Sequence, residues 1–489
     1  MSAEAQKKEK KNLYVVHLII MAIIMVGFRL VPPPGTVTTY GMAVLGVFLG
    51  LVYGWTFIDL LIPSVAGAII LATTGYGSVQ DVLVAMFSNS TVIMMIFGVF
   101  AFMAIQQSGA GDWAVAKLLG SKLAKKSPVM ILEIFFLIFI LGNICGIVWF
   151  LYFALMPLMA NMLQKCGYEK GDKFNFFFLA GCLMAGQMGM SIFPFMGWSL
   201  MTAGTMMQLT QTAISYNTYM ALMVILIVVM MVTYPLLMKL CGCKFDKMAD
   251  VDIVAAFPNV KGDDKITQRQ SLAIWSVVVF IVVMVILSMF SSNIAILNTI
   301  NLQIGVLGLM MILWIFVIAF RTKDGKPLLD MREAAGSFTW DMLMLIAAAL
   351  LISSVLTSEE TGISSWLAGL LMPIFAGKSP FLFMFILALV TIILTNVGNN
   401  IALCFVMLNL VSVMYNNGFP VNITAAAVVI SLSSVFVAYL TPAASLPGAL
   451  LHSSACLKPA TMYKWTWPLM LYGAVLLMVV LIPYMMMAG

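Results

Sequence analysis

Two asparagines, each in the middle of a long apolar segment, are the residues whose type and setting point most directly to chemistry. They lie in the polar stretches Gly142-Asn143-Ile144-Cys145-Gly146 and Thr395-Asn396-Val397-Gly398-Asn399-Asn400. A second stretch with Gly, Pro and hydroxyl residues follows each one, from Gln187 to Pro194 and from Thr441 to Gly448. At membrane depth, irregular backbone is tolerated only where protein surrounds it or where it lines a water-filled cavity. The four breaks therefore predict a site for a small polar solute inside a membrane.

The residues at these breaks suit the binding of an anion together with a cation. A half-helix that starts at a break presents unpaired N–H groups and the positive end of its dipole, which favours an anion. The carbonyls freed at the end of the preceding half-helix favour a cation such as Na⁺. The predicted substrate-binding residues are Gly142, Asn143, Ile144, Ser191, Pro194, Thr395, Asn396, Val397, Thr441, Pro442 and Ser445. The predicted sodium ligands, mainly through backbone carbonyls, are Asn143, Gly189, Asn396 and Ala443.

The two asparagines belong to two copies of one unit. Four residue pairs are 253 positions apart, and Lys126-Ser127-Pro128 recurs as Lys378-Ser379-Pro380 at an offset of 252. The four pairs are Gly109 and Gly362, Trp113 and Trp366, Asn143 and Asn396, and Pro194 and Pro447. Two copies with a polar break in each are typical of a secondary transporter whose site lies near the middle of the bilayer.

Composition assigns the chain to the membrane. Of 489 residues, 63% are apolar and only 9% are charged. Apolar runs of about 20 residues recur along the chain, and each is long enough to cross the hydrocarbon core. Basic residues are scattered over short loops, so nucleic acid is not an expected partner. The apolar run after the N-terminal lysines has no small-residue cleavage pattern, and it predicts a retained first helix.

We predict an all-α polytopic protein with about eleven transmembrane helices and two re-entrant hairpins. The hairpins are residues 128–162 and 379–414, because each is too long for one span and polar at its centre. Half of such a segment, about 17 residues, is long enough to reach the middle of the membrane and turn back. The predicted parts are a tail and first helix (1–39), a first repeat (40–240), a cytoplasmic loop (241–270) and a second repeat (271–489).

Charge placement supports this topology. With the N-terminus in the cytoplasm and each hairpin returning to its own side, 23 of the 25 Lys and Arg residues fall on cytoplasmic segments, and only Arg29 and Lys378 lie outside. Cytoplasmic loops carry this excess of basic residues in membrane proteins. The rule predicts an inverted repeat in the plasma membrane, with the C-terminus on the extracytoplasmic side.

The arrangement resembles the divalent anion/sodium symporter family of the ion transporter superfamily. That family carries Ser-Asn-Thr at each hairpin tip and unwinds the following span at Thr-Pro or Ser-Pro. Here Asn143 and Asn396 match the central asparagine, and Thr441-Pro442 keeps the unwound motif. The flanking hydroxyls are replaced by Gly142, Ile144 and Val397.

The resemblance implies a homodimer with an elevator-like motion. Its solutes would be dicarboxylates, citrate or sulfate, carried with Na⁺ as coupling ion and without another cofactor.

Other readings of these residues stay open. A lone asparagine in an apolar segment also serves as a hydrogen bond between helices, and Ser191, Thr441 and Ser445 also occur as packing kinks. Sodium-independent anion exchange uses the same architecture. A cation/proton antiporter of the same superfamily needs an acid at the midplane, and Glu133, near Lys125 and Lys126, is also readily explained as an interfacial acid. An enzyme needs a nucleophile–base pair or metal ligands, and the two histidines are remote from each other in sequence.

Overall fold

The computed structural model describes residues 3–121, 127–146, 150–248, 265–291, 293–323, 325–375, 377–396, 399–442 and 444–487. Regular structure in these ranges is helical, apart from one isolated bridge between Arg321 and Pro327. The prediction of an all-α polytopic membrane protein is confirmed.

The first half of the chain forms helices up to residue 240. They are α1 (Ala3–Gly27), η1 (Phe28–Leu30), α2 (Thr39–Phe57), α3 (Leu61–Leu71), η2 (Ala72–Tyr76), α4 (Val79–Phe87), α5 (Ser90–Ser108), α6 (Ala110–Leu119), α7 (Pro128–Ile144), η4 (Phe150–Leu155), α8 (Met156–Lys165), α9 (Lys173–Ser191), α10 (Gly197–Thr210) and α11 (Tyr216–Leu240).

The second half begins within the predicted loop 241–270. Its helices are η5 (Asp246–Met248), α13 (Gln268–Phe290), α14 (Ala295–Gln303), α15 (Gly305–Ala319), α16 (Met331–Ser337), α17 (Trp340–Leu356), η6 (Glu359–Thr361), α18 (Ile363–Phe375), α19 (Pro380–Thr395), α20 (Asn400–Asn416), α21 (Ile423–Ser433), α22 (Leu446–Ser453) and α23 (Pro459–Met487).

Seven helices in the described ranges are long and apolar enough to cross a membrane, or up to eleven if each of four bent pairs counts as one span. The predicted span 303–320 corresponds to α15, and α14 meets the start of α15 at 78°. Helix α14 was not predicted, because its residues are more polar than those of α15.

The two predicted hairpin segments each form two helical arms. Residues 128–162 contain α7, a π-helical turn (η4) and most of α8, and residues 379–414 contain α19 and most of α20. Ser127 and Ser379 cap the first arms by accepting the backbone N–H of Met130 (3.2 Å) and Leu382 (3.3 Å), and a proline follows each serine. Serine caps and a proline in the first turn are favourable helix starts.

Other paired residues also share a local conformation. Gly109 and Gly362 both adopt the left-handed region, with φ of 68° and 66°. Each accepts the backbone N–H of its tryptophan, Trp113 (3.2 Å) or Trp366 (3.1 Å). Only glycine adopts this region at little cost, so the two copies use the same residue for the same turn before α6 and α18.

Both predicted breaks inside spans are present, with shifted bounds. Helix α9 runs through Gln187 to Ser191, so the first break covers only residues 192–196. The second break covers residues 434–442 and 444–445 and starts several residues before Thr441. Irregular backbone thus separates α9 from α10 and α21 from α22.

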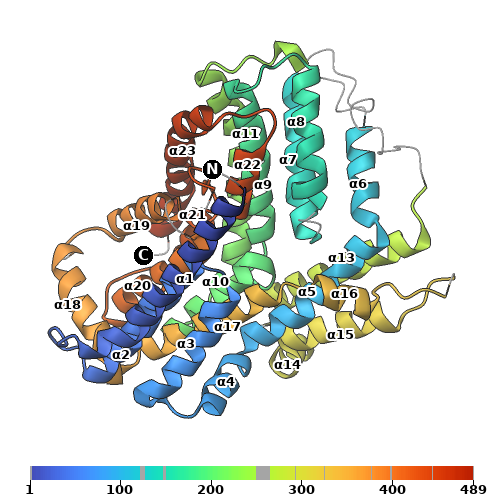
Figure 1. Cartoon of the computed structure of the whole chain (residues 1–489). Coiled ribbons are helices and arrows are strands. Elements are labelled where there is room, and N and C mark those ends of the chain that lie inside the picture. Colours follow the sequence, from blue (N-terminus) through green and yellow to red (C-terminus); the bar gives the residue numbers. More distant parts are fainter. Residues whose placement is uncertain are drawn as a thin grey trace.

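Helix α9 is the central packing element. It packs along α7 and also contacts α11, α21, α22 and α23. Of its span, 94% is buried. A Cβ atom on Gly189 would lie 2.3 Å from the Ile140 carbonyl oxygen, so the absence of a side chain allows α9 to approach the end of α7. In Figure 1, α7, α8, α9 and α11 run side by side above α5, α13 and α15.

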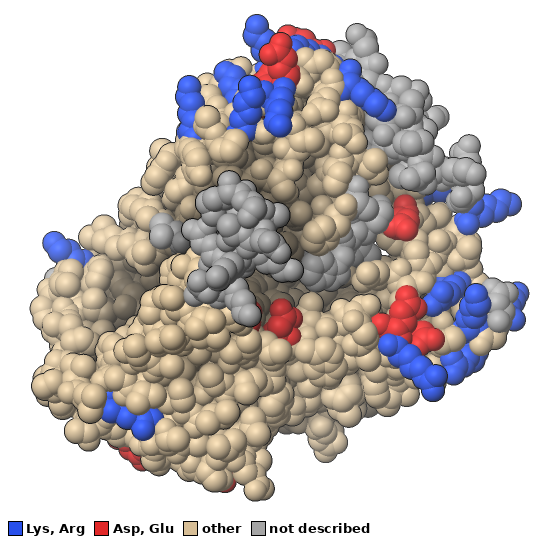
Figure 2. All heavy atoms as spheres, viewed as in Figure 1, with Lys and Arg blue, Asp and Glu red and all other residues tan. Residues whose placement is uncertain are grey.

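Basic side chains gather on limited parts of the surface. Figure 2 shows most Lys and Arg at the top, over the ends of α9 and α11, and at the right, around α13, α15 and α16. Few occur on the broad tan surface between them in this view. This separation of charged and apolar surface is expected for a protein that sits in a bilayer.

Candidate functional site

The first hairpin tip ends α7 with the predicted residues Gly142, Asn143 and Ile144. The Asn143 side chain is 5% exposed, and its Nδ2 donates to the carbonyl of Phe139 (2.8 Å). Its Oδ1 is buried and has no partner among the described residues. A buried carbonyl oxygen without a donor is energetically costly, so this oxygen is available to bind a ligand.

A chain of hydroxyl groups spans the first break. Ser199 of α10 donates to the carbonyl of Ser191 (2.6 Å) across the break, and Tyr219 of α11 donates to the Ser199 hydroxyl (2.9 Å). The hydroxyl of Ser191 itself has no described partner. Pro194 is buried within the break, and α10 then starts without a side-chain cap. The first N–H groups of α10 therefore lack a side-chain acceptor.

At the second tip, the side chains of Thr395 and Asn396 are both fully buried. The Thr395 hydroxyl donates to the carbonyls of Thr391 (2.9 Å) and Ile392 (3.2 Å), so its proton is already used within α19. Val397 lies outside the described residues. The following arm, α20, is capped by Asn399, whose Oδ1 accepts the N–H of Ile401 (2.9 Å) and that of Ala402 (3.2 Å).

Asn396 holds the second break. Its Oδ1 accepts the backbone N–H groups of Tyr439 (3.0 Å) and Leu440 (2.8 Å), and its Nδ2 donates to the carbonyl of Ile392 (2.7 Å). Thr441 donates its hydroxyl to the carbonyl of Asn396 (3.0 Å). The asparagine amide thus takes the place of the helical carbonyls that this backbone lacks, and this explains why the break begins before Thr441.

Ser445 and Pro442 complete the second break. The Ser445 hydroxyl donates to the carbonyl of Ala438 (2.6 Å) and accepts the N–H of Gly448 (3.0 Å), so it closes the break and caps α22. Pro442 is exposed. Ala443, one of the predicted sodium ligands, lies outside the described residues.

His452 was not among the predicted site residues, but it contacts the same peptides as Asn396. Its Nε2 lies 3.1 Å from the carbonyl of Tyr439 and 3.2 Å from that of Leu440. Carbonyl oxygens only accept, so Nε2 must carry the proton. Asn396 and His452 therefore hold the N–H and C=O groups of the same two residues. A polar residue one turn after Gly448 was the only sign of this role in the sequence.

Gln187 and Tyr152 are further residues that the sequence did not assign. Gln187 on α9 is 4% exposed, and its Nε2 donates to the hydroxyl of Tyr152 in η4 (3.4 Å). The Oε1 of Gln187 has no described partner. Tyr152 lies in an apolar run of the sequence, so its hydrogen bond with Gln187 is known only from the structure.

The two repeats meet around α9, α10, α21 and α22. Trp198 of α10 donates to the carbonyl of Ser431 in α21 (2.9 Å), and Asn175 of α9 donates to the carbonyl of Cys456 (3.2 Å). The structure therefore joins the second tip to the break of its own repeat and places the two breaks on neighbouring helices. Among the described residues, no hydrogen bond links Asn143 directly to Asn396.

The described residues include no group of three or more His, Cys, Asp or Glu side chains that could hold a metal ion. Na⁺ does not require such a group, because amide and backbone carbonyl oxygens are sufficient to bind it. Asn143 Oδ1 fits this requirement, whereas Asn396 Oδ1 already accepts two N–H groups.

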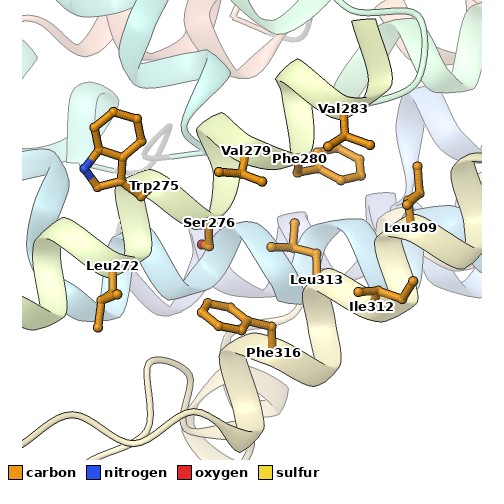
Figure 3. Close-up of a pocket in the computed structure, with 10 residues that line it drawn as sticks. All are labelled: Leu272, Trp275, Ser276, Val279, Phe280, Val283, Leu309, Ile312, Leu313 and Phe316. Carbon is orange, nitrogen blue, oxygen red and sulfur yellow. The ribbon is translucent and has the colours of Figure 1, made fainter. Parts of the chain in front are cut away.

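A cavity of about 330 Å³ lies away from these breaks, between α13 and α15. Figure 3 shows the lining side chains of α13, with Ser276 directed toward Phe316, and those of α15, among them Leu313 and Ile312. Ser276 is the one polar residue in its lining, so this cavity lacks the groups that would bind an anion.

Two breaks in membrane-spanning segments, and a buried asparagine at the tip of the hairpin in each repeat, define a membrane transporter built from repeats. The chain matches the model of the citrate transporter family over residues 50–433 and belongs to this family. The resemblance to transporters of this superfamily that the sequence suggested is confirmed. The family identifies the protein as a secondary transporter and not an enzyme.

Solved structures support the fold. MtrF from Neisseria gonorrhoeae, described as illuminating a class of antimetabolite efflux pumps, aligns with a TM-score of 0.57 at 16% identity, over 96% of this chain and 94% of MtrF. The YdaH transporter from Alcanivorax borkumensis, described as having an unusual topology, aligns with a TM-score of 0.51 at 13% identity, over 90% of this chain and 96% of YdaH. Identities this low show a shared fold only. No curated protein matches the chain.

The contacts of the two asparagines predict unequal effects of their removal. Asn396→Ala leaves the N–H groups of Tyr439 and Leu440 without an acceptor, and each unpaired buried group costs about 1–3 kcal/mol. Asn143→Ala removes one donor to a carbonyl. Thermal unfolding in detergent should show a clearly lower midpoint for Asn396→Ala than for Asn143→Ala. Equal midpoints would contradict the structural role of Asn396.

The role of His452 predicts rescue by a chosen substitution. His452→Ala removes the donor to Tyr439 and Leu440, and we expect the KM for transport to rise about tenfold, as for the loss of ~1.4 kcal/mol. His452→Gln keeps an N–H donor at a similar reach and should restore most of the affinity. Uptake kinetics in liposomes measure both, and a glutamine variant as impaired as the alanine variant would rule out this role.

Proposed function

We propose that the protein carries small anions of the di- and tricarboxylate class, with citrate as the first substrate to test and sulfate as the inorganic alternative. One observation carries the proposal: at each hairpin tip, a buried asparagine lies beside irregular backbone of its own repeat. Membership of the citrate transporter family supports a carboxylate substrate.

The first repeat offers the anion both side-chain and backbone groups. Helix α10 begins in mid-span without a side-chain cap, so its N–H groups and positive dipole end favour negative charge. In the second repeat, α20 and α22 begin with side-chain caps from Asn399 and Ser445. In the second repeat, the groups that would bind the anion therefore lie mainly in the break that Asn396 holds.

Sodium is the proposed coupling ion. The free Oδ1 of Asn143 and the carbonyls near Gly189 supply neutral oxygen ligands in the first repeat. A cation bound there would offset the charge of the anion in a medium of low dielectric. In the second repeat, Asn396 would have to release Tyr439 or Leu440 before its Oδ1 could bind an ion.

An elevator-like motion of the hairpins against the remaining helices is the proposed route across the membrane. The left-handed turns at Gly109 and Gly362, at the start of α6 and α18, are suitable pivots because glycine adopts this conformation at little cost. We also propose a homodimer in the plasma membrane, with a cytoplasmic N-terminus and an extracytoplasmic C-terminus.

One observation favours the cation/proton alternative. Glu133 on α7 has a buried Oε2 with no described partner. An intramembrane carboxyl is the group that such an antiporter needs. Glu133 lies ten residues before Asn143, or roughly 15 Å along a helix, so the anion site and this acid are separate features that can be tested apart.

Uptake by liposomes containing the purified protein tests the proposal. Labelled citrate, succinate and sulfate are supplied with and without an inward sodium gradient, and with and without internal anion. We expect uptake of citrate or succinate that rises with the sodium gradient, because the bound cation neutralises the anion.

The remaining outcomes discriminate between the alternatives. Uptake only against internal anion would identify an exchanger. Loss of carboxylate uptake in Glu133→Gln, with retained thermal stability, would point to proton coupling. Absence of uptake of all three anions under every condition would contradict the proposed function.

A further inference from the structure

The apolar cavity between α13 and α15 opens on the outer surface of the protein. Of the residues that line it, Trp275, Val279 and Ile312 are each more than half exposed. Helix α13 is long and apolar enough to span a membrane, and α15 belongs to a bent pair that is. Exposed apolar side chains on such helices face the hydrocarbon of the bilayer. The cavity is therefore accessible to a molecule that lies in the membrane.

The length of the cavity matches one leaflet of a bilayer. Its α13 residues extend from Leu272 to Val283, which is roughly 16 Å at 1.5 Å per residue. The hydrocarbon core is about 30 Å thick, so the cavity covers about half of it. In Figure 3, Leu272 and Leu309 lie at opposite ends of the row of lining side chains. The mostly apolar lining suits an acyl chain of a lipid.

The loop that follows α15 lies beside the Leu272 end of the cavity. The backbone N–H of Lys323 donates to Gln268 Oε1 (3.2 Å), and Arg269 Nη2 donates to the carbonyl of Leu328 (3.3 Å). Both contacts join this loop to the first turn of α13. Arg269 precedes Leu272 by three residues, so the two side chains share one face of the helix. The loop and Arg269 thus continue the line of the cavity.

This end of the cavity is basic. The loop carries three exposed basic residues: Arg321, Lys323 and Lys326. With Arg269 they form what we call the basic cluster, and the Nε of Arg269 is buried without a partner among the described residues. Of the nearby acids, Asp324 lies outside the described residues, and Asp330 uses its Oδ1 to cap α16. A buried cationic donor without an acceptor is costly, and an anion beside the cluster would satisfy it.

We propose that the cavity and the basic cluster bind one anionic phospholipid, with an acyl chain in the cavity and the phosphate on the cluster. Basic pockets between transmembrane helices bind anionic head groups in other membrane proteins. Trp275, which follows Arg269 by six residues and is exposed, is suited to the head-group level, where tryptophan is enriched. This lipid site is separate from the hairpin tips and breaks.

Charge favours a lipid in the cavity over a second copy of this chain. In a twofold dimer, the same surface of both subunits meets at the interface. With the axis normal to the membrane, pairing through this cavity would bring the basic clusters of both subunits to the same depth, where like charges repel. An anionic head group instead offsets the charge of the cluster.

Native mass spectrometry of the purified full-length protein tests the head-group contact. The protein is titrated with phosphatidylglycerol, which is anionic, or with phosphatidylcholine, which has no net charge. We expect the wild-type protein to bind phosphatidylglycerol more tightly. In the triple variant Arg321→Gln, Lys323→Gln and Lys326→Gln, the Kd for phosphatidylglycerol should rise about tenfold or more, because each basic residue at the surface contributes to the attraction.

A second triple variant is the matched control. It carries Lys165→Gln, Lys239→Gln and Lys244→Gln, which remove the same charge from exposed positions around the ends of α8 and α11. Its Kd for phosphatidylglycerol should equal that of the wild-type protein. Thermal unfolding in detergent checks that both variants are folded, and the exposed positions were chosen for this reason.

Filling the cavity tests the acyl-chain contact. Val279→Trp places a large side chain in the lining, whereas Val282→Trp places one on the same helix outside the lining, at a position exposed to a similar extent. We expect Val279→Trp to weaken the binding of phosphatidylglycerol about tenfold and Val282→Trp to leave it unchanged.

Three outcomes would overturn the lipid site. They are equal affinity of the wild-type protein for the two lipids, an unchanged Kd in the Arg321, Lys323 and Lys326 variant, and an unchanged Kd in Val279→Trp. In the last case, conversion of a dimer to a monomer by Val279→Trp would identify the cavity as an interface between two copies of the chain. None of these measurements depends on transport, so a failure of the proposed function and a failure of the lipid site are distinguishable.

Discussion

The structure depends on one constraint: backbone groups that leave a helix inside a membrane must find other partners. In the second repeat, the amide of Asn396 accepts the N–H groups of Tyr439 and Leu440, and His452 donates to their carbonyls. Four backbone groups are thus satisfied by two side chains, so the break is a defined structure and not a frayed helix. The positions of Thr441, Ser445 and the start of α22 follow from it, since each of their hydrogen bonds lies within this break or reaches the Asn396 backbone.

Both repeats place an asparagine at the hairpin tip, but the two asparagines differ in how many hydrogen bonds they make. Both asparagines donate Nδ2 to the carbonyl four residues earlier, Phe139 at 2.8 Å and Ile392 at 2.7 Å. Among the described residues, Asn396 has its Oδ1 occupied, while that of Asn143 is buried and has no partner. A buried polar atom without a partner is uncommon in folded proteins. The asymmetry fits the proposal that the Asn143 oxygen contacts a ligand, while Asn396 mainly holds the backbone of its break.

The sequence predicted the helical fold, the paired segments and the two asparagines, because each depends on a polar residue in an apolar run or on a repeated spacing. It did not predict α14 and α16, which meet α15 and α17 at bends, because these two helices are short and more polar than the spans that follow them. The second break was expected at Thr441 and begins at Ser434, because the residues between them are mostly apolar and the side chains that hold their backbone, Asn396 and His452, are distant in the sequence. Tyr152, Gln187 and His452 were not assigned, since their roles depend on neighbours far away in the chain.

We propose that the tips and breaks of both repeats form one anion site. Hydrogen–deuterium exchange of the purified protein, with and without saturating citrate, tests this most directly because it reports backbone protection segment by segment. Citrate is expected to protect residues 192–196 together with the break between α21 and α22, along with the ends of α7 and α19. Protection of only one repeat, or protection confined to the apolar cavity between α13 and α15, would contradict it.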